Sequence, residues 1–276
     1  MKKGYIIDMD DIVVSYFANK NEFDKIIRDN CHDRYEIICP FSCLGSCAIE
    51  GNEHILNQRS LLLIPPLAFR IHNLGEQIDF EGYSIRFSRQ VISEKISSML
   101  DKITSCGENI GRYYPSNIVP DALIDIFRRF DDAFHLPTVE QRAFLETLVC
   151  EAIIFMSALD GNVILHKENE LGARVVKYLN SNVEKNISLD NLANKFFVSK
   201  YHLCRAFKKY SGASVHAYIN KKRIMYAKQL IESGETASGA AEKIGFGDYS
   251  AFYRAYFKMI GKSPTKEQRR GAEDEI

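Results

Sequence analysis

Between residues 172 and 270 the sequence contains an internal repeat, and this repeat restricts the possible fold more than any other feature. Each copy reads as a short helix, a tight turn and a longer helix, which begins at Ser199 in the first copy and at Asp248 in the second. Ser and Asp side chains accept hydrogen bonds from the free N–H groups of a first helical turn. This order is typical of helix-turn-helix units, which one long helix over 215–232 would join. Two copies are too few to bury the core of a solenoid.

Charge is distributed unevenly along the chain, although the formal net charge is zero. Residues 1–169 hold 17 lysines and arginines against 25 aspartates and glutamates, and residues 170–276 hold 19 against 11. A basic region joined to an acidic one indicates contact with nucleic acid through one end of the molecule. The charge therefore favours two DNA-reading units over a purely structural helical array.

The N-terminal half reads differently from the repeat. Residues 1–90 contain short runs rich in β-branched and aromatic residues, separated by turns, which indicate a barrel or a sandwich. The apolar spacing then becomes helical, with one amphipathic helix over 121–134 and a second over 139–159. We therefore predict a two-domain α+β protein. Its parts are a β-barrel with a following helix pair over 1–160, a linker over 161–171, an all-α domain with two helix-turn-helix units over 172–270, and an acidic tail over 271–276.

Neither a membrane span nor a disulfide framework is expected. The longest apolar run, over 61–69, is broken by prolines and is shorter than the roughly 18–20 residues of a membrane helix. Acidic residues interrupt the N-terminus, so it does not resemble a signal peptide. Seven cysteines are an odd count, which indicates reduced thiols.

The sequence gives little support for a metal site or a catalytic site. Cys39, Cys43 and Cys47 recur every four residues, but along one strand they would spread over roughly 26 Å and could not share an ion. Small buried hydrophobic residues are the preferred interpretation. A Ser-His-Asp order, a phosphate-binding loop and a dinucleotide fingerprint are all absent. We therefore expect no cofactor and no bound metal.

Three motifs follow one another along the repeat: Val198-Ser199-x-x-x-Leu203-x-Arg205-x-Phe207, Arg223-Ile-x-x-Ala227-x-x-Leu230, and Ile244-Gly-Phe246 through Gly261-x-Ser-Pro264. Through these motifs the repeat resembles the AraC/XylS family of bacterial transcription regulators. The N-terminal half is similar to the cupin-like effector domain of that family, through His32-Asp-Arg-Tyr-Glu-Ile37 and Gln58-Arg-Ser-Leu-Leu-Leu-Ile-Pro-Pro66.

The chain departs from the family pattern in its second unit and in its first turn. Ala237 and Ala240 stand where the family usually has isoleucines, and Phe257 replaces a usual lysine. A less stable second unit with weaker phosphate contact is therefore expected. Phe197 stands where the second unit has Gly245, so the first turn is expected to differ in geometry.

The resemblance implies a sequence-specific DNA-binding regulator, which we expect to be an activator, in the bacterial cytoplasm and on the nucleoid when bound to DNA. The implied partners are double-stranded promoter DNA, a small-molecule effector such as a sugar or related metabolite, and RNA polymerase if the protein activates. A homodimer through helices 121–159 is also implied. Either this contact or simple core packing explains one apolar stripe, formed by Leu145, Leu148, Val149, Ala152, Ile153 and Met156.

The alternative from another class is a metal-dependent cupin enzyme with a DNA-binding appendage. Such a site needs several histidines and carboxylates that converge on one ion. His32, Glu36, His54 and His72 are available, but no His-x-His pair occurs among them. We therefore expect no enzyme activity, and small-molecule binding suits the N-terminal half better. The candidate effector-binding residues, which could also be barrel surface, are Arg34, Glu36, Arg70, His72 and Tyr83.

Two helices of the repeat are candidate recognition helices, whose N-terminal residues lie against base edges in the major groove. Leu203 and Phe207 in one, and Phe252 and Tyr256 in the other, are expected in the core. The candidate base contacts are Tyr201, Cys204, Arg205, Tyr249, Ser250, Tyr253 and Arg254. Phosphate contacts position a protein without specifying sequence, and the candidates are Ser199, Lys200, Lys208, Lys209, Lys221, Lys222, Arg223 and Lys258.

Overall fold

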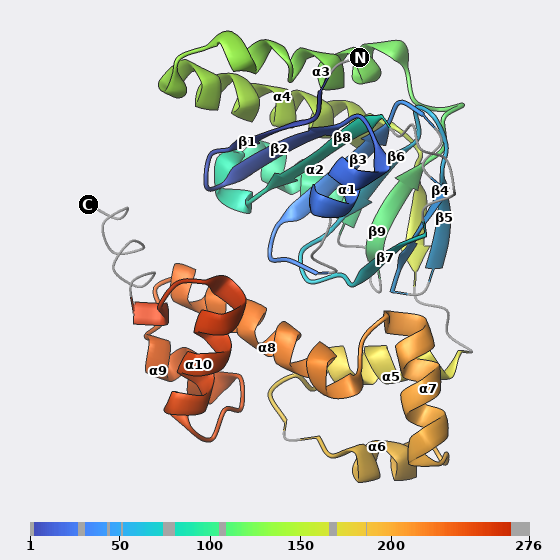
Figure 1. Ribbon diagram of the computed structural model, residues 1–276, viewed down its shortest axis with the longest axis vertical. Coiled ribbons are helices and arrows are strands. Elements are labelled where there is room, and N and C mark those ends of the chain that lie inside the picture. The colour runs from blue at the N-terminus through green and yellow to red at the C-terminus, as the bar shows by residue number, and fades with distance from the viewer. Residues whose placement is uncertain are drawn as a thin grey trace. The chain divides into compact units, whose positions relative to one another are not determined.

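The computed structural model describes residues 3–26, 31–42, 45–50, 52–73, 81–104, 109–165, 170–185 and 187–265. The chain divides into two compact units, Met1–His166 and Lys167–Ile276 (Figure 1). Among the described residues, no helix combines the length and the apolar character that crossing a membrane requires. The predicted acidic tail over 271–276, like Cys43, lies outside the described residues.

The first unit contains two antiparallel sheets. The larger sheet has the strand order β1 (Tyr5–Asp8), β2 (Ile12–Phe17), β8 (Gly82–Phe87), β3 (Tyr35–Pro40), β6 (Leu61–Ile64), β9 (Asn109–Tyr114) and β10 (Asn162–Leu165). The smaller sheet has the order β5 (Asn52–Leu56), β4 (Gly45–Ile49) and β7 (Arg70–Asn73). The helices are α1 (Lys20–Ile26), α2 (Glu94–Thr104), α3 (Asp121–Arg129) and α4 (Thr138–Ala158), with short 3-10 turns at Arg89–Val91 and Asp132–His135.

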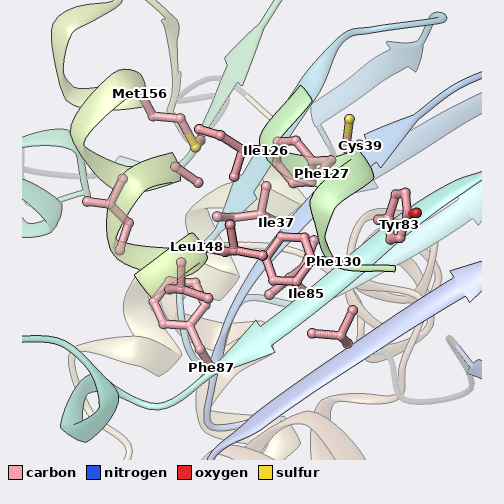
Figure 2. Packing of buried hydrophobic residues seen from close by; sticks show 14 of the residues in the cluster. Ile37, Cys39, Tyr83, Ile85, Phe87, Ile126, Phe127, Phe130, Leu148 and Met156 are labelled. Carbon is pink, nitrogen blue, oxygen red and sulfur yellow. The ribbon is translucent and has the colours of Figure 1, made fainter. Parts of the chain in front are cut away.

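The two faces of the larger sheet pack against different elements, because successive side chains of a strand point to opposite faces. Ile37, Ile85 and Phe87 join one core with residues of α2, α3 and α4 (Figure 2). Ile38 and Leu62 point the other way and join a second core with residues of the smaller sheet and of α1. The unit therefore has a helix-covered core and a separate core between its sheets.

The structure decides between the two explanations of the apolar stripe and shortens the first predicted helix. Leu145, Leu148, Val149, Ala152, Ile153 and Met156 are all buried in the helix-covered core. This stripe is therefore core packing and is not available to a second copy of the chain. In addition, α3 ends at Arg129, a 3-10 turn follows, and Phe134 is half exposed instead of lying on the buried face.

The predicted linker also contains a strand. Residues 162–165 form β10, which pairs antiparallel with β9, so that Asn162 lies opposite Tyr113 and Val163 lies opposite Arg112. The short run of β-forming residues there continues the larger sheet, so the linker assignment over 161–171 is corrected for these four residues. Residues 166–169 lie outside the described part, and α5 begins at Leu171.

The second unit consists of six helices in its described part. They are α5 (Leu171–Asn180), α6 (Leu189–Lys195), α7 (Lys200–Ser211), α8 (Val215–Glu232), α9 (Ala237–Lys243) and α10 (Tyr249–Ile260). The Ser199 side chain accepts from the backbone N–H of His202, and Asp248 accepts from those of Ser250 and Ala251. The residues that mark helix starts in the sequence therefore begin α7 and α10.

Each longer helix packs through the predicted apolar stripe. Leu203 and Phe207 of α7 are fully buried, and the Phe207 ring lies edge-on to Tyr218 of α8 at 5.3 Å between centroids. Phe252 and Tyr256 of α10 are equally buried, in a cluster that includes Ala237 and Ala240. The packing of α9 against α10 thus uses small residues, Ala237 and Ala240, where the family pattern has larger ones.

The turn between α6 and α7 adopts the same backbone conformation as the turn between α9 and α10. Phe197 has φ of 55° and Gly245 has φ of 75°. The next residues make matching hydrogen bonds, from Val198 N–H to the Ala193 oxygen and from Phe246 N–H to the Ala241 oxygen, both 3.0 Å. The expectation of a different first turn is therefore wrong. Phe197 keeps a left-handed conformation that costs a residue with a Cβ about 1 kcal/mol.

Replacing Phe197 by glycine should stabilise the second unit by up to about 1 kcal/mol, since the strain is removed and the 94% exposed side chain gives up no packing. Gly245→Ala should destabilise it, because the added Cβ would lie 2.0 Å from the Glu184 carbonyl oxygen. Gly247→Ala is the control, since nothing lies within 4 Å of its Cβ position. Urea unfolding measures the free energy of unfolding of all three variants. A Phe197→Gly variant less stable than the wild type would contradict the assignment of backbone strain to Phe197.

Candidate nucleic-acid interface

One face of α7 is exposed along its length, opposite the stripe that packs into the second unit. Tyr201 is 76% exposed and Arg205 is also exposed, while Cys204 between them is half-buried. These positions lie three and four residues apart, a spacing that places side chains on one helix face. The structure therefore brings together the three candidate base contacts of the first helix-turn-helix pair, α6–α7.

The corresponding face of α10 carries a similar set. Ser250, Tyr253 and Arg254 are exposed, and Tyr249 lies beside them at the helix start. The Tyr253 ring stacks nearly parallel on Phe257, with 6.3 Å between the centroids. This exposed aromatic pair holds Tyr253 at the surface of α10.

Arg205 and Arg254 occupy equivalent positions in the two helix-turn-helix pairs, α6–α7 and α9–α10. Each lies six residues after the N-cap of its helix, Ser199 or Asp248, and each is exposed. An arginine near the start of a recognition helix can donate two hydrogen bonds to O6 and N7 of a guanine. The same donor thus stands at the same place on both helices.

Five of the eight candidate phosphate contacts are lysines that lie in three kinds of surroundings, while Ser199 is the exposed N-cap of α7. Lys208, Lys209 and Lys258 are exposed and lie in the last turns of α7 and α10. Lys200 is exposed and forms an ion pair of 2.5 Å with Asp190 of α6. Lys221 is half-buried on α8. These five lysines leave positive charge on or beside both helices.

Two of the phosphate assignments are corrected. Lys222 is only 8% exposed, and its Nζ lies 5.4 Å from the centroid of the Tyr218 ring, one helical turn earlier. Arg223 donates from Nε to the Val183 oxygen at 2.7 Å and from an Nη to the Lys185 oxygen at 2.6 Å. Burial lowers the pKa of its guanidinium. Lys222 is therefore packed inside the unit, and Arg223 ties α8 to the segment that precedes α6.

In the first unit, three of the five candidate effector residues meet between the two sheets. Glu36 of β3 and Arg70 of β7 form an ion pair, with 3.0 Å between Oε2 and Nε, and both are at most 1% exposed. His72 of β7 lies on the same strand face as Arg70, two residues on. The sequence prediction therefore found part of a buried polar cluster.

Tyr83 does not belong to this cluster. It points to the helix-covered face of the sheet (Figure 2), where its hydroxyl donates to Asp131 at 2.6 Å. Because successive side chains of β8 point to opposite faces of the sheet, Ser84 and Arg86 lie on the other face and reach Glu36. Arg34 is half-buried in the turn before β3, where its backbone N–H donates to Nδ1 of His32. The polar alternation of Ser84 and Arg86 is the signal that the sequence prediction missed.

Three side chains besides Arg70 bind the Glu36 carboxylate. Ser84 Oγ donates at 2.6 Å, Arg86 Nε lies 3.4 Å away, and His32 Nε2 lies 3.5 Å away. Burial alone would raise the pKa of Glu36, but the positive charge of Arg70 and these neighbours hold it well below its usual value. Burial lowers the pKa of His72 to about 3, helped by the charge of Arg70. Glu36 is therefore ionised and His72 neutral near pH 7.

Comparison with known proteins places the second unit in a family. Residues 192–270 match the family model of a helix-turn-helix domain. PqrA of Proteus vulgaris, named a probable transcription factor, is 32% identical over 100 residues, which cover 35% of this chain and 82% of PqrA. LumQ of Photobacterium leiognathi, named a probable transcriptional regulator, is 34% identical over 92 residues, 33% of this chain and 37% of LumQ.

A solved structure with a similar segment is that of a probable AraC family transcriptional regulator from Rhodopseudomonas palustris CGA009. It is 25% identical and covers 37% of this chain and 94% of its own, with a TM-score of 0.33. The chain belongs to the AraC/XylS family of transcription regulators, as its motifs predicted. LumQ and PqrA are both named for regulating transcription, and another similar protein, AdaA of Bacillus subtilis, is named a bifunctional transcriptional activator and DNA repair enzyme.

Proposed function

We propose that this chain regulates transcription by reading promoter DNA with two helix-turn-helix units, α6–α7 and α9–α10. The observation that carries the proposal is the equivalence of Arg205 and Arg254, exposed at the same position of two helices of the same design. Recognition helices of this kind present such residues to base edges in the major groove. The two units would then read two parts of one site.

The proposed contacts follow the exposed faces of α7 and α10. Bases are contacted by Tyr201, Cys204, Arg205, Tyr249, Ser250, Tyr253 and Arg254. Phosphates are contacted by Ser199, Lys200, Lys208, Lys209, Lys221 and Lys258. Lys200 would exchange its partner Asp190 for a phosphate, an exchange that costs little because both side chains are more than half exposed.

The first unit is proposed as a cupin-like effector domain. Its two facing sheets and the polar cluster around Glu36 support a site for a small molecule, which would shift the protein between two arrangements and so alter DNA binding. Activation with contact to RNA polymerase belongs to the same proposal. A homodimer through α3 and α4 would have to use their outer side, where Val139 and Ile154 are exposed.

Salt dependence of binding tests the DNA-binding proposal. The full-length chain should bind a promoter fragment upstream of its own gene with an affinity that falls steeply as salt rises, because each neutralised phosphate releases counterions. Fluorescence anisotropy at several salt concentrations measures the slope. Lys209→Ala should lower that slope by about one, while Lys102→Ala on α2 serves as a charge-matched control. A folded protein with no salt-dependent binding would contradict the proposal.

A further inference from the structure

Arg70 is an arginine whose terminal nitrogens are buried without a protein partner among the described residues. The side chain is 1% exposed, and its Nε faces Glu36 at 3.0 Å. Neither Nη1 nor Nη2 has a hydrogen-bond partner in the part of the chain that the structure describes. A buried donor left unsatisfied costs about 1–3 kcal/mol, and more when it is charged. A stable fold is therefore expected to supply these nitrogens with an acceptor.

His72 provides a second unpartnered atom on the same face of β7. Its side chain is half-buried, with Nε2 4.0 Å from the Cys47 sulfur. The His72 ring lies edge-on to the Phe23 ring, with 5.2 Å between the centroids. Its Nδ1 has no hydrogen-bond partner among the described residues. Residues two apart on a strand lie side by side. Arg70 and His72 thus direct three unused polar atoms into the same region between the sheets.

The carboxylate beside these atoms is already engaged by Arg70. Among the described residues, the charged groups that act on the His72 ring are Arg70, Arg86 and Glu36, and Glu36 faces the Nε of Arg70. Glu50, another buried carboxylate of this unit, accepts from the backbone N–H of Phe69 at 3.0 Å. The surroundings are apolar, with Phe23, Ile38 and Leu62 in the same core. Nη1 and Nη2 of the Arg70 guanidinium lack an acceptor among the described residues, and an anion matches them best, because hydrogen bonds between charged groups are the strongest.

We propose that Arg70 and His72 bind the anionic head, a carboxylate or a phosphate, of the small molecule that controls this regulator. The inference rests on the proposed effector domain and narrows its ligand class. A guanidinium presents its N–H groups as a planar fork that matches two oxygens of such a head. The neutral His72 ring adds one further donor. A neutral sugar would offer this buried guanidinium only uncharged acceptors.

The depth of Arg70 bears on how the anion enters. Because this side chain is almost fully enclosed, the chain around it has to move before an anion can reach the guanidinium. Association is therefore expected to be slow relative to that of an open surface site. Small compact anions should bind faster than bulky ones.

Calorimetry and thermal unfolding of the full-length chain test the site, with inorganic phosphate, acetate and benzoate as probes and with arabinose and sodium chloride as comparisons. We expect saturable binding of one phosphate or carboxylate per chain, and no effect of arabinose. Phosphate alone or a carboxylate alone would identify the head group. Chloride that raises the melting temperature as much as the oxyanions would mean an adventitious ion only and would overturn the proposal, as would arabinose alone.

Three variants locate the anion. Arg70→Met should weaken binding at least tenfold, whereas Arg89→Met, which removes an exposed arginine paired with Asp101, should leave it unchanged. Glu36→Gln removes the competing carboxylate, so the folded variant should bind the anion more tightly than the wild type. This variant keeps the test decisive if Arg70→Met fails to fold. Weaker binding by folded Glu36→Gln, or equal binding by Arg70→Met, would overturn the site.

The DNA experiment separates this inference from the proposed function. A chain that binds its promoter with normal salt dependence but binds none of the anions contradicts only the anion site. A chain that binds an anion through Arg70 but does not bind promoter DNA contradicts the proposed regulator and leaves the anion site standing.

Discussion

Glu36→Ala should destabilise the first unit by about 3–5 kcal/mol, the largest effect expected of any single substitution in this protein. The carboxylate is fully buried and pairs with Arg70 and Arg86, so its loss leaves the buried Arg70 guanidinium without this counter-charge. Urea unfolding followed by circular dichroism measures the loss. Asp125→Ala is the matched control, because its pair with Arg128 is exposed and should contribute less than about 1 kcal/mol. Similar losses for both variants would contradict the role of the cluster.

The pH dependence of stability provides an independent check on Glu36. A carboxyl whose folded pKa lies below its unfolded value adds stability above the unfolded pKa, near 4.5, and this contribution is lost as the pH falls through the folded pKa. His32 and His72 also have lowered folded pKa values, so protonation below about pH 6.5 favours the unfolded chain. Wild-type stability should therefore fall in two stages on acidification. Glu36→Gln should lack the stage below about pH 4.5.

Arg205→Ala should weaken binding to the preferred DNA site by about 1–3 kcal/mol, the loss of one bidentate arginine–guanine contact. Arg254→Ala should have the same kind of effect in the other half of the site. The Arg254 effect is expected to be the smaller, since the second helix-turn-helix pair, α9–α10, carries small core residues at Ala237 and Ala240 and an exposed Phe257. Titration of each variant with the preferred sequence and with a scrambled one measures the loss.

Lys209→Ala is the control for these two arginines. It lies in the last turn of α7, away from the N-terminal face, and should weaken the preferred and scrambled sequences alike. If Arg205→Ala behaves like Lys209→Ala, then Arg205 contacts phosphate or solvent, and the first recognition face is assigned wrongly.

Helix boundaries in the second unit were predictable because single residues set them. Ser199 and Asp248 accept from the free N–H groups of α7 and α10, and Gly212 and Gly261 end these helices in the left-handed conformation. The outward faces followed once Leu203 and Phe252 were placed in the core. These features depend on neighbours within about one helical turn, which a sequence displays directly.

Other features depended on contacts that are distant in the sequence. The sequence predicts Lys222 and Arg223 as phosphate contacts, but Lys222 is buried and Arg223 donates to the backbone oxygens of Val183 and Lys185. Tyr83 was assigned to the wrong face because its strand parity is fixed only by pairing with β2 and β3. The same pairing sets Arg86 opposite Glu36. The alternation of Ser84 and Arg86 indicates that the two share a face, but it does not identify Glu36 as their partner.

Selection of binding sites from random DNA by the full-length chain tests the central claim, that α7 and α10 each read one part of a single site. The selected sequences should contain two conserved blocks about 10–10.5 base pairs apart, one helical turn of B-DNA, if both helices enter the same face. Arg205→Ala should randomise one block and Arg254→Ala the other. A single conserved block that neither arginine variant alters, or no enrichment at all, would contradict the account.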